Sequence, residues 1–149
     1  MNIHDTVNDI LVNLFREILV VEENAIITGE FKNITVNDMH IIEAVGLEGR
    51  NMSAIAKSLG ITVGSLTTSM NGLVKKEYVL RERSEEDRRI VMIRLTEKGE
   101  RAYAAHKVFH DEMTEAVIAS IDKEDIPTLT NVLQGLIKFF REYNPGSKG

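Results

Sequence analysis

The sequence contains no cysteine, which excludes disulfides, thiolate nucleophiles and cysteine-ligated zinc. No apolar run approaches the roughly 20 residues needed to span a bilayer, and the first ten residues lack the basic and apolar regions of a signal peptide. A phosphate-binding glycine loop, a Gly-x-Ser-x-Gly motif and a His-Glu-x-x-His motif are also missing. We therefore expect a cytoplasmic protein that is not an enzyme and needs no cofactor.

What is present is typical of one globular domain over residues 1–149, with 43% apolar and 28% charged residues. The net charge of −5 argues at first sight against nucleic acid as a partner. However, residues 62–101 carry a net charge of +2 and the rest of the chain −7. The charge distribution therefore points weakly to the middle of the chain as the part that meets an anionic partner.

The first part of the chain is predicted to be helical. Apolar residues at steps of three and four predict a long amphipathic helix over about residues 3–28, capped by Asn2 with Asp5. A second helix follows the cap formed by Thr35 and Asp38 and stops at Gly46. These two helices precede the region that carries the functional signal.

Two shorter helices in the middle form a predicted helix-turn-helix. The first covers about residues 52–59, and the second is capped by Thr62 and runs to about residue 76. Ala56, Gly60 and Leu66 fall where this unit needs a small contact residue, a permissive turn and a core anchor. The second helix is predicted to turn four residues inward: Leu66, Met70, Leu73 and Val74.

A β-hairpin and two further helices complete the predicted elements. Residues 78–83 and 90–95 are rich in β-formers and are joined by a polar segment. Thr96 is expected to cap a helix to about residue 120, and a last helix opens near Asp122. Because proline disrupts a helix interior, Pro127 predicts an irregular first turn or a start nearer Pro127.

The second helix of the helix-turn-helix has an outward face suited to reading bases. Short hydrogen-bonding side chains and two lysines that can reach phosphates lie on it: Ser65, Thr67, Thr68, Ser69, Asn71, Lys75 and Lys76. An ordinary solvated helix face is the alternative explanation.

The hairpin that follows favours the DNA-binding interpretation. Five arginines lie on it or beside it: Arg81, Arg83, Arg88, Arg89 and Arg94. A β-wing next to a recognition helix can place an arginine in the adjacent minor groove, and Asp87 is suited to hold such an arginine by a salt bridge. The expected fold is thus mainly α with a small β-wing, a winged helix-turn-helix.

The motifs in this region resemble the MarR family of bacterial regulators. Residues 54–59, 64–69 (GSLTTS), 87–89 (DRR) and 95–99 (LTEKG) carry the resemblance. Asn144-Pro145-Gly146 predicts the end of the last helix and a loose tail at 145–149. The resemblance implies a DNA-binding lobe over residues 35–100 and helical dimerisation regions at 1–30 and 101–144. It also implies a homodimer on palindromic double-stranded DNA, with Arg89 as the minor-groove arginine and Asp87 as its brace.

A narrower resemblance is to the branch of this family that represses fatty-acid synthesis genes. Residues 31–32, 39–40, 64–69, 84–89 and 106–110 (HKVFH) carry it. It implies a long-chain acyl group on acyl carrier protein as co-repressor. The candidate effector-binding residues are His40, His106, Phe109 and His110.

The histidines also leave a different hypothesis open. His106 and His110 are four residues apart, a spacing that can present two imidazoles to a metal ion, and His40 is the candidate third ligand. The chain would then be a divalent-metal sensor on the same scaffold. Ordinary hydrogen-bonding histidines are the simpler interpretation, so no metal ligand is predicted. A winged helix that serves only as a protein-interaction module is a third possibility.

Overall fold

The computed structural model describes residues 2–26 and 29–143. The chain divides into two compact units, Met1–Phe109 and His110–Gly149, and each is described by itself. The predicted end of the first helix at residue 28 and the predicted tail at 145–149 lie outside the described residues.

Four helices of the first unit begin where the sequence predicts, and the short 3-10 turn among them was not predicted. They are α1 (Ile3–Ile26), the 3-10 turn η1 (Gly29–Phe31), α2 (Val36–Val45), α3 (Met52–Leu59) and α4 (Val63–Lys75). The backbone N–H of Asp5 donates to Asn2 Oδ1 at 2.9 Å, and Thr35 and Asp38 form a reciprocal capping box at 3.0 and 3.1 Å. Thr62 Oγ1 accepts from the N–H of Ser65 at 3.1 Å, so all three predicted caps are confirmed.

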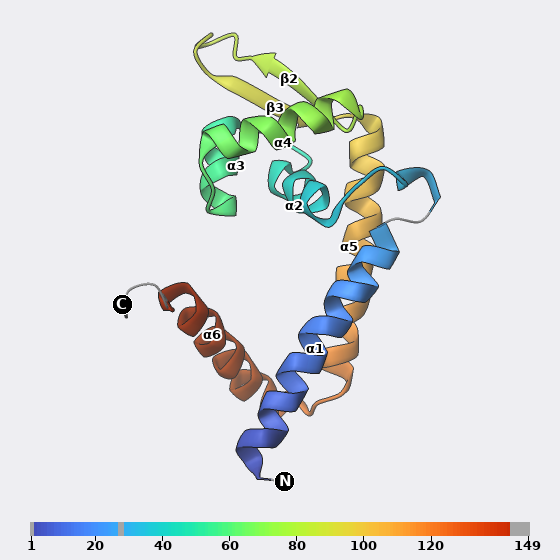
Figure 1. Cartoon of the computed structure of the whole chain (residues 1–149), viewed down its shortest axis with the longest axis vertical. Coiled ribbons are helices and arrows are strands. Elements are labelled where there is room, and N and C mark those ends of the chain that lie inside the picture. Colours follow the sequence, from blue (N-terminus) through green and yellow to red (C-terminus); the bar gives the residue numbers. More distant parts are fainter. Residues whose placement is uncertain (1, 27–28, 144–149) are drawn as a thin grey trace. The chain divides into compact units, whose positions relative to one another are not determined.

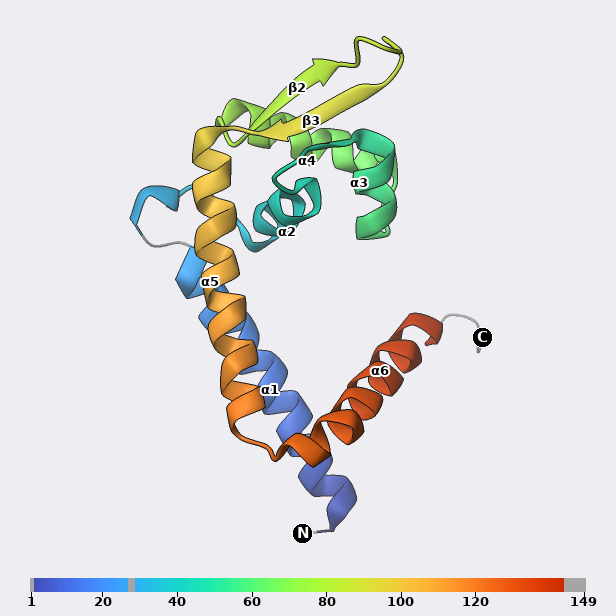
Figure 2. The ribbon, with the colours of Figure 1, turned by 180° about the vertical axis from the view of Figure 1, so that it is seen from behind.

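A three-stranded antiparallel sheet follows α4, with the order β1-β3-β2. The predicted hairpin is β2 (Val79–Arg83) and β3 (Val91–Leu95), with Arg81 opposite Ile93. Figures 1 and 2 show this hairpin beside α4. The third strand, β1 (Arg50–Asn51), was not predicted, because two residues are too few to show an alternating pattern.

The core of the first unit lies among α2, α3, α4 and the sheet. Its fully buried side chains include Ile42, Ile55, Leu66, Met70, Leu73, Tyr78 and Ile93. Ala56 is 3% exposed and Gly60 has a φ of +68°, as the helix-turn-helix interpretation requires. The inward prediction for Val74 was wrong, because this side chain is 37% exposed. One residue beyond Leu73 is a turn of about 100°, which carries Val74 off the buried stripe.

The start of α5 (Glu97–Ala119) packs closely against the residue that precedes β2. Thr96 Oγ1 accepts from the N–H of Gly99 at 3.0 Å, which confirms the predicted cap. A Cβ at Gly99 would collide with the carbonyl oxygen of Tyr78, so a side chain there would force the backbone apart. The buried Tyr78 hydroxyl donates to Asn33 Oδ1 at 2.8 Å.

The second unit holds the remainder of α5, the 3-10 turn η2 (Lys123–Asp125) and α6 (Ile126–Glu142). Pro127 lies in the first turn of α6 and a 3-10 turn precedes it, so the predicted irregular start is confirmed. No residue of α6 is buried, and several large apolar side chains are about half exposed: Val132, Leu133, Ile137, Phe139 and Phe140. Within the described residues, no helix has both the length and the apolar character required to span a membrane.

Candidate nucleic-acid interface

The predicted reading face of α4 is exposed along the helix. Leu66, Met70 and Leu73 are buried on the opposite side, and the exposed set is Ser65, Thr67, Thr68, Asn71 and Lys75. The Thr67 hydroxyl donates to the carbonyl of Val63 at 2.7 Å, so its proton is used inside the helix. The Thr67 hydroxyl can therefore still accept a hydrogen bond, but its proton is not available to an acceptor on a base.

The two lysines at the end of α4 differ in their surroundings. Lys75 is exposed, whereas Lys76 Nζ donates to Asp38 Oδ2 on α2 at 2.8 Å. Asp38 is only 7% exposed and also caps α2, so this ion pair joins the two helices. The prediction that Lys76 reaches phosphates is corrected: its ammonium faces the lobe's own carboxylate.

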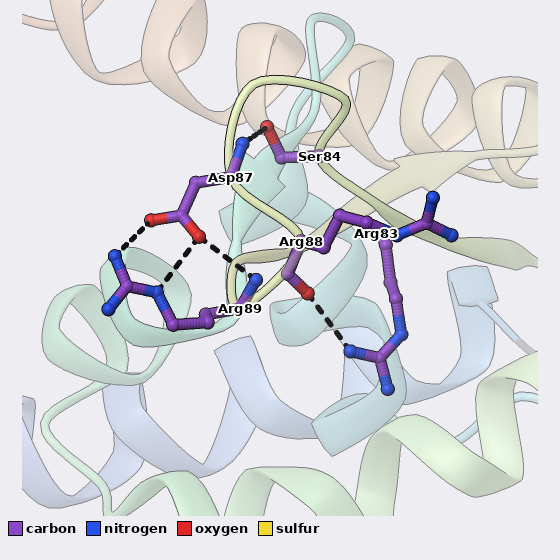
Figure 3. Close-up of polar contacts among 5 residues, drawn as sticks. All are labelled: Arg83, Ser84, Asp87, Arg88 and Arg89. Atoms are coloured by element: carbon purple, nitrogen blue, oxygen red, sulfur yellow. Dashed lines mark hydrogen bonds and ion pairs between the residues drawn. The ribbon is translucent and has the colours of Figure 1, made fainter.

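The wing is the β2–β3 hairpin, and its tip contains an ion pair between Asp87 and Arg89 (Figure 3). Asp87 Oδ1 accepts from Arg89 Nε at 3.0 Å and from the Arg89 backbone N–H at 3.1 Å, and Oδ2 accepts from Nη2 at 3.0 Å. The side-chain hydrogen bonds from Arg89 lower the pKa of the Asp87 carboxyl. The predicted salt bridge is confirmed, and it fixes the orientation of an arginine whose side chain is 90% exposed.

Arg83 and Arg88 sit differently in the same tip (Figure 3). Arg83 Nη1 donates to the backbone carbonyl of Arg88 at 2.9 Å, which ties the strand to the loop. Ser84 Oγ accepts from the Asp87 N–H at 3.4 Å. Arg83 thus supports the shape of the tip, while the exposed Arg88 lies within it.

A groove of about 570 Å³ separates the start of α3 and α4 from the wing. It is lined by Asn51, Met52, Ser53, Val63, Thr67, Arg81, Arg89, Ile90 and Val91. Its two charged lining residues are both arginines, and Arg81 Nη2 donates to Asn71 Oδ1 at 2.6 Å. This bond between wing and recognition helix was not predicted, because only the folded hairpin brings the two residues together.

The candidate effector residues fall into different environments. His106 is buried on α5, His40 is exposed on α2, and Phe109 and His110 are half-buried. His106 and Phe109 line a cavity of about 10 Å³ together with Ala25, Phe31, Ile34, Met39, Ala102 and Ala105. His40 is not among these lining residues. His110 follows His106 by one turn of α5, as its spacing predicts.

Glu22 of α1 joins this region, although the sequence did not single it out. Glu22 Oε1 lies 2.9 Å from His106 Nε2 and 3.4 Å from His40 Nε2. Burial alone raises the pKa of the Glu22 carboxyl, but the hydrogen bond from His106 and the charge of His40 lower it overall. No local pattern could have revealed Glu22, since a glutamate on an amphipathic helix is usually solvated.

Comparison with known proteins assigns the family. The family model described as transcriptional regulator SarA/Rot matches residues 27–105. The chain belongs to the SarA/Rot family of transcriptional regulators. The match spans the whole helix-turn-helix, the wing and the first part of α5.

Several relatives of this SarA/Rot-family regulator extend the comparison. A crystal structure of Streptococcus pneumoniae FabT in complex with DNA is 36% identical, with a TM-score of 0.84 over 93% of this chain and 98% of that one. The regulator SarZ of Staphylococcus haemolyticus is 31% identical over 70% of this chain and 71% of its own. YpoP of Bacillus subtilis, a regulator of the helix-turn-helix type, is 30% identical over 61% of this chain, which spans 63% of YpoP.

These findings confirm the MarR-like winged-helix fold and the resemblance on which it was predicted. The SarA/Rot-family chain is a DNA-binding transcriptional regulator of the MarR type. Its relatives are transcription regulators rather than enzymes.

Proposed function

We propose that this chain is a sequence-specific repressor that binds palindromic DNA as a homodimer. In this proposal α4 enters the major groove and the wing places Arg89 in the adjacent minor groove. The observation that carries it is the groove between α4 and the wing, which is lined by Arg81, Arg89 and Thr67. The Asp87 brace supports it further, because an arginine already held in one orientation loses little conformational freedom on binding.

The remaining contacts divide into two kinds. Thr67, Thr68 and Asn71 are proposed to face bases, with Ser65 at the start of the helix. Lys75, Arg83 and Arg88 are proposed to face phosphates, where they fix register without reading sequence. A two-fold dimer would read half-sites about one helical turn, ~10 bp, apart.

The dimer is supported by apolar surface on both units. Ile3, Ile10, Leu14 and Leu19 of α1 are between 50% and 78% exposed, and α6 exposes its own apolar stripe. Exposed apolar side chains in such numbers on one helix usually mark an interaction surface. A second copy of this chain is the partner that two-fold palindromic DNA requires.

Replacing Arg89 with alanine tests the wing. We expect the DNA affinity to fall by about 1–3 kcal/mol in a fluorescence anisotropy titration, with the fold unchanged by circular dichroism. Arg101→Ala is the matched control, because Arg101 is an exposed arginine that pairs with Glu30 away from the groove. Equal affinities for the two variants would remove the wing from the mechanism.

We further propose that the regulated genes serve fatty-acid synthesis and that a long-chain acyl group on acyl carrier protein is the co-repressor. The similarity to FabT and the apolar cavity beside His106 and Phe109 support this proposal. The cavity of about 10 Å³ is far smaller than the roughly 300–1,000 Å³ of ordinary ligand sites. Acyl binding therefore requires the side chains around the cavity, including the flexible Met39, to move apart.

Footprinting with and without long-chain acylated carrier protein tests the effector. We expect a palindromic footprint over fatty-acid synthesis genes that the acyl form tightens. Phe109→Ala should abolish the response to the acyl form and keep the basal footprint, because Phe109 lines the cavity and not the DNA groove. A footprint indifferent to acyl groups would leave DNA binding intact and overturn the effector.

A further inference from the structure

Asn71 lies on the exposed face of α4 that is proposed to read bases, one turn after Thr67. The amide of an asparagine has two different ends, because Oδ1 only accepts hydrogen bonds and Nδ2 only donates them. When both ends face a base, the amide pairs with N6 and N7 of adenine. The base that Asn71 prefers therefore depends on which end of its amide is turned toward the DNA.

Arg81 determines the orientation of this amide. Its Nη2 donates to Asn71 Oδ1 at 2.6 Å. A guanidinium carries five N–H donors and no acceptor, so only the oxygen end of the amide can face it. A base amino group that approached the second lone pair of Oδ1 would bring its own positive N–H beside this cation. The two N–H groups of Nδ2 are thus the groups that Asn71 has left for a base.

The register of the hairpin explains why Arg81 reaches α4. Side chains two positions apart lie on one face of a strand, so Arg81 shares a face of β2 with the buried Val79. Its cross-strand partner Ile93 is also buried. This face packs against α4, and Arg81 continues it beyond the apolar core to the groove that it lines together with Thr67. The contact with Asn71 therefore follows from the pairing of β2 with β3.

We propose that Arg81 is a positioning residue for sequence recognition, which holds Asn71 so that its amide donates to a base and does not accept from one. The bases that present acceptors to such a donor in the major groove are guanine, through O6 and N7, and thymine, through O4. Adenine and cytosine are disfavoured, because each presents an amino group there. This inference rests on the proposed DNA-binding function and adds to it the class of base that Asn71 reads.

The preference for one base pair of the site tests the proposal in the full chain. Selection from random double-stranded DNA gives the preferred sequence, and the base pair at which Asn71→Ala loses its preference is the one that Asn71 reads. There we expect the wild type to prefer guanine or thymine to adenine by at least about fivefold in anisotropy titrations. Arg81→Ala should reduce this preference to about twofold or less, because an amide that can turn also pairs with adenine.

The double variant separates positioning from a direct contact between Arg81 and DNA. If Arg81 acts through Asn71, then Arg81→Ala causes no further loss of base preference in an Asn71→Ala background. Arg81→Lys keeps a cation that can donate to Oδ1, so it should retain part of the preference. Arg83→Ala is the matched control, since Arg83 lies two positions further along β2 and is proposed to face a phosphate. It should weaken binding to all sequences alike.

Nuclear magnetic resonance relaxation of the protein without DNA tests the bond itself. The side-chain amide of Asn71 should be ordered in the wild type and should lose this order in Arg81→Ala. The side-chain amide of Asn33 is the internal reference, because it is held by the Tyr78 hydroxyl, and it should be unchanged.

Three results would overturn the inference and leave DNA binding in place. These are a wild-type preference for adenine or cytosine at the base pair that Asn71 reads, a preference that Arg81→Ala leaves unchanged, or a uniform loss of affinity in Asn71→Ala. Failure of the wild type to select any sequence would instead overturn the proposed function, and this inference with it. The relaxation of the Asn71 amide would still report whether its bond to Arg81 forms.

Discussion

The DNA-binding lobe and helix α1 show the same kind of apolar periodicity with opposite outcomes. In the lobe, Leu66, Met70 and Leu73 of α4 are fully buried by elements of the same chain. In α1, Ile10 and Leu14 remain 57% and 50% exposed. The contrast teaches that periodicity identifies the face of a helix that will be covered, but not the molecule that covers it.

The largest expected effect comes from opening a cavity in the buried core of the DNA-binding lobe. Leu66→Ala removes a fully buried side chain, and we expect the free energy of unfolding to fall by about 2–5 kcal/mol in urea denaturation. Leu80→Ala on β2 is the matched control, because Leu80 is 50% exposed, and it should change stability by less than about 1 kcal/mol. Similar losses of stability for both variants would contradict the placement of Leu66 in the core and of Leu80 at the surface.

A charge on α1 tests what covers that helix. Leu14→Glu should leave the fold intact and raise the dissociation constant of the homodimer at least tenfold, which is about 1.4 kcal/mol, because the charge would be buried between two copies. Analytical ultracentrifugation over a concentration series measures this effect. Asn13→Glu introduces the same charge at the neighbouring exposed position and should have little effect. A wild-type monomer would refute the proposed second copy.

A smaller effect in the DNA-binding lobe is expected from removing one buried hydroxyl, that of Tyr78. Tyr78→Phe removes the hydrogen bond to Asn33 and should lower the free energy of unfolding by about 0.5–1.5 kcal/mol at neutral pH. Burial, and then the charges of Asp38 and Glu30, raise the pKa of the Tyr78 hydroxyl above its ordinary value near 10.

The unfolded wild type therefore loses its Tyr78 proton first as the pH rises, so the stability that Tyr78 provides is present below about pH 10 and declines above it. The difference in the free energy of unfolding between wild type and Tyr78→Phe should therefore be smaller at about pH 11 than at about pH 8. Urea denaturation of both proteins at each pH measures it. A constant difference would argue against the raised pKa.

The smallest expected effect separates two adjacent lysines. Lys75→Ala should reduce the slope of log affinity against log salt concentration by about one unit, because one phosphate contact is lost. Lys76→Ala should leave that slope unchanged and instead cost about 1 kcal/mol of stability through its ion pair with Asp38. Anisotropy titrations at several salt concentrations, together with denaturation curves, distinguish the two. The reverse pattern would show that the ion pair opens on DNA.

Features set by neighbouring residues could be predicted from the sequence, and features set by distant residues could not. The caps at Asn2, Thr35 and Thr62 and the Asp87–Arg89 pair each involve residues within three positions of one another. The pairs Lys76–Asp38 and His106–Glu22 join residues 38 and 84 positions apart. Such pairs follow from tertiary packing, which a single sequence does not reveal.

The contact between Gly99 and the Tyr78 carbonyl has a consequence for genetics. Every replacement of glycine by another residue adds at least a Cβ, so no missense change at this position leaves the junction between hairpin and α5 as it is. Under the proposed repression, a selection for strains that have lost it should therefore yield mutants at codon 99 as well as at codon 89. The Gly99 variants would unfold at a lower temperature or accumulate to a lower level. The Arg89 variants would be abundant and folded but unable to bind DNA.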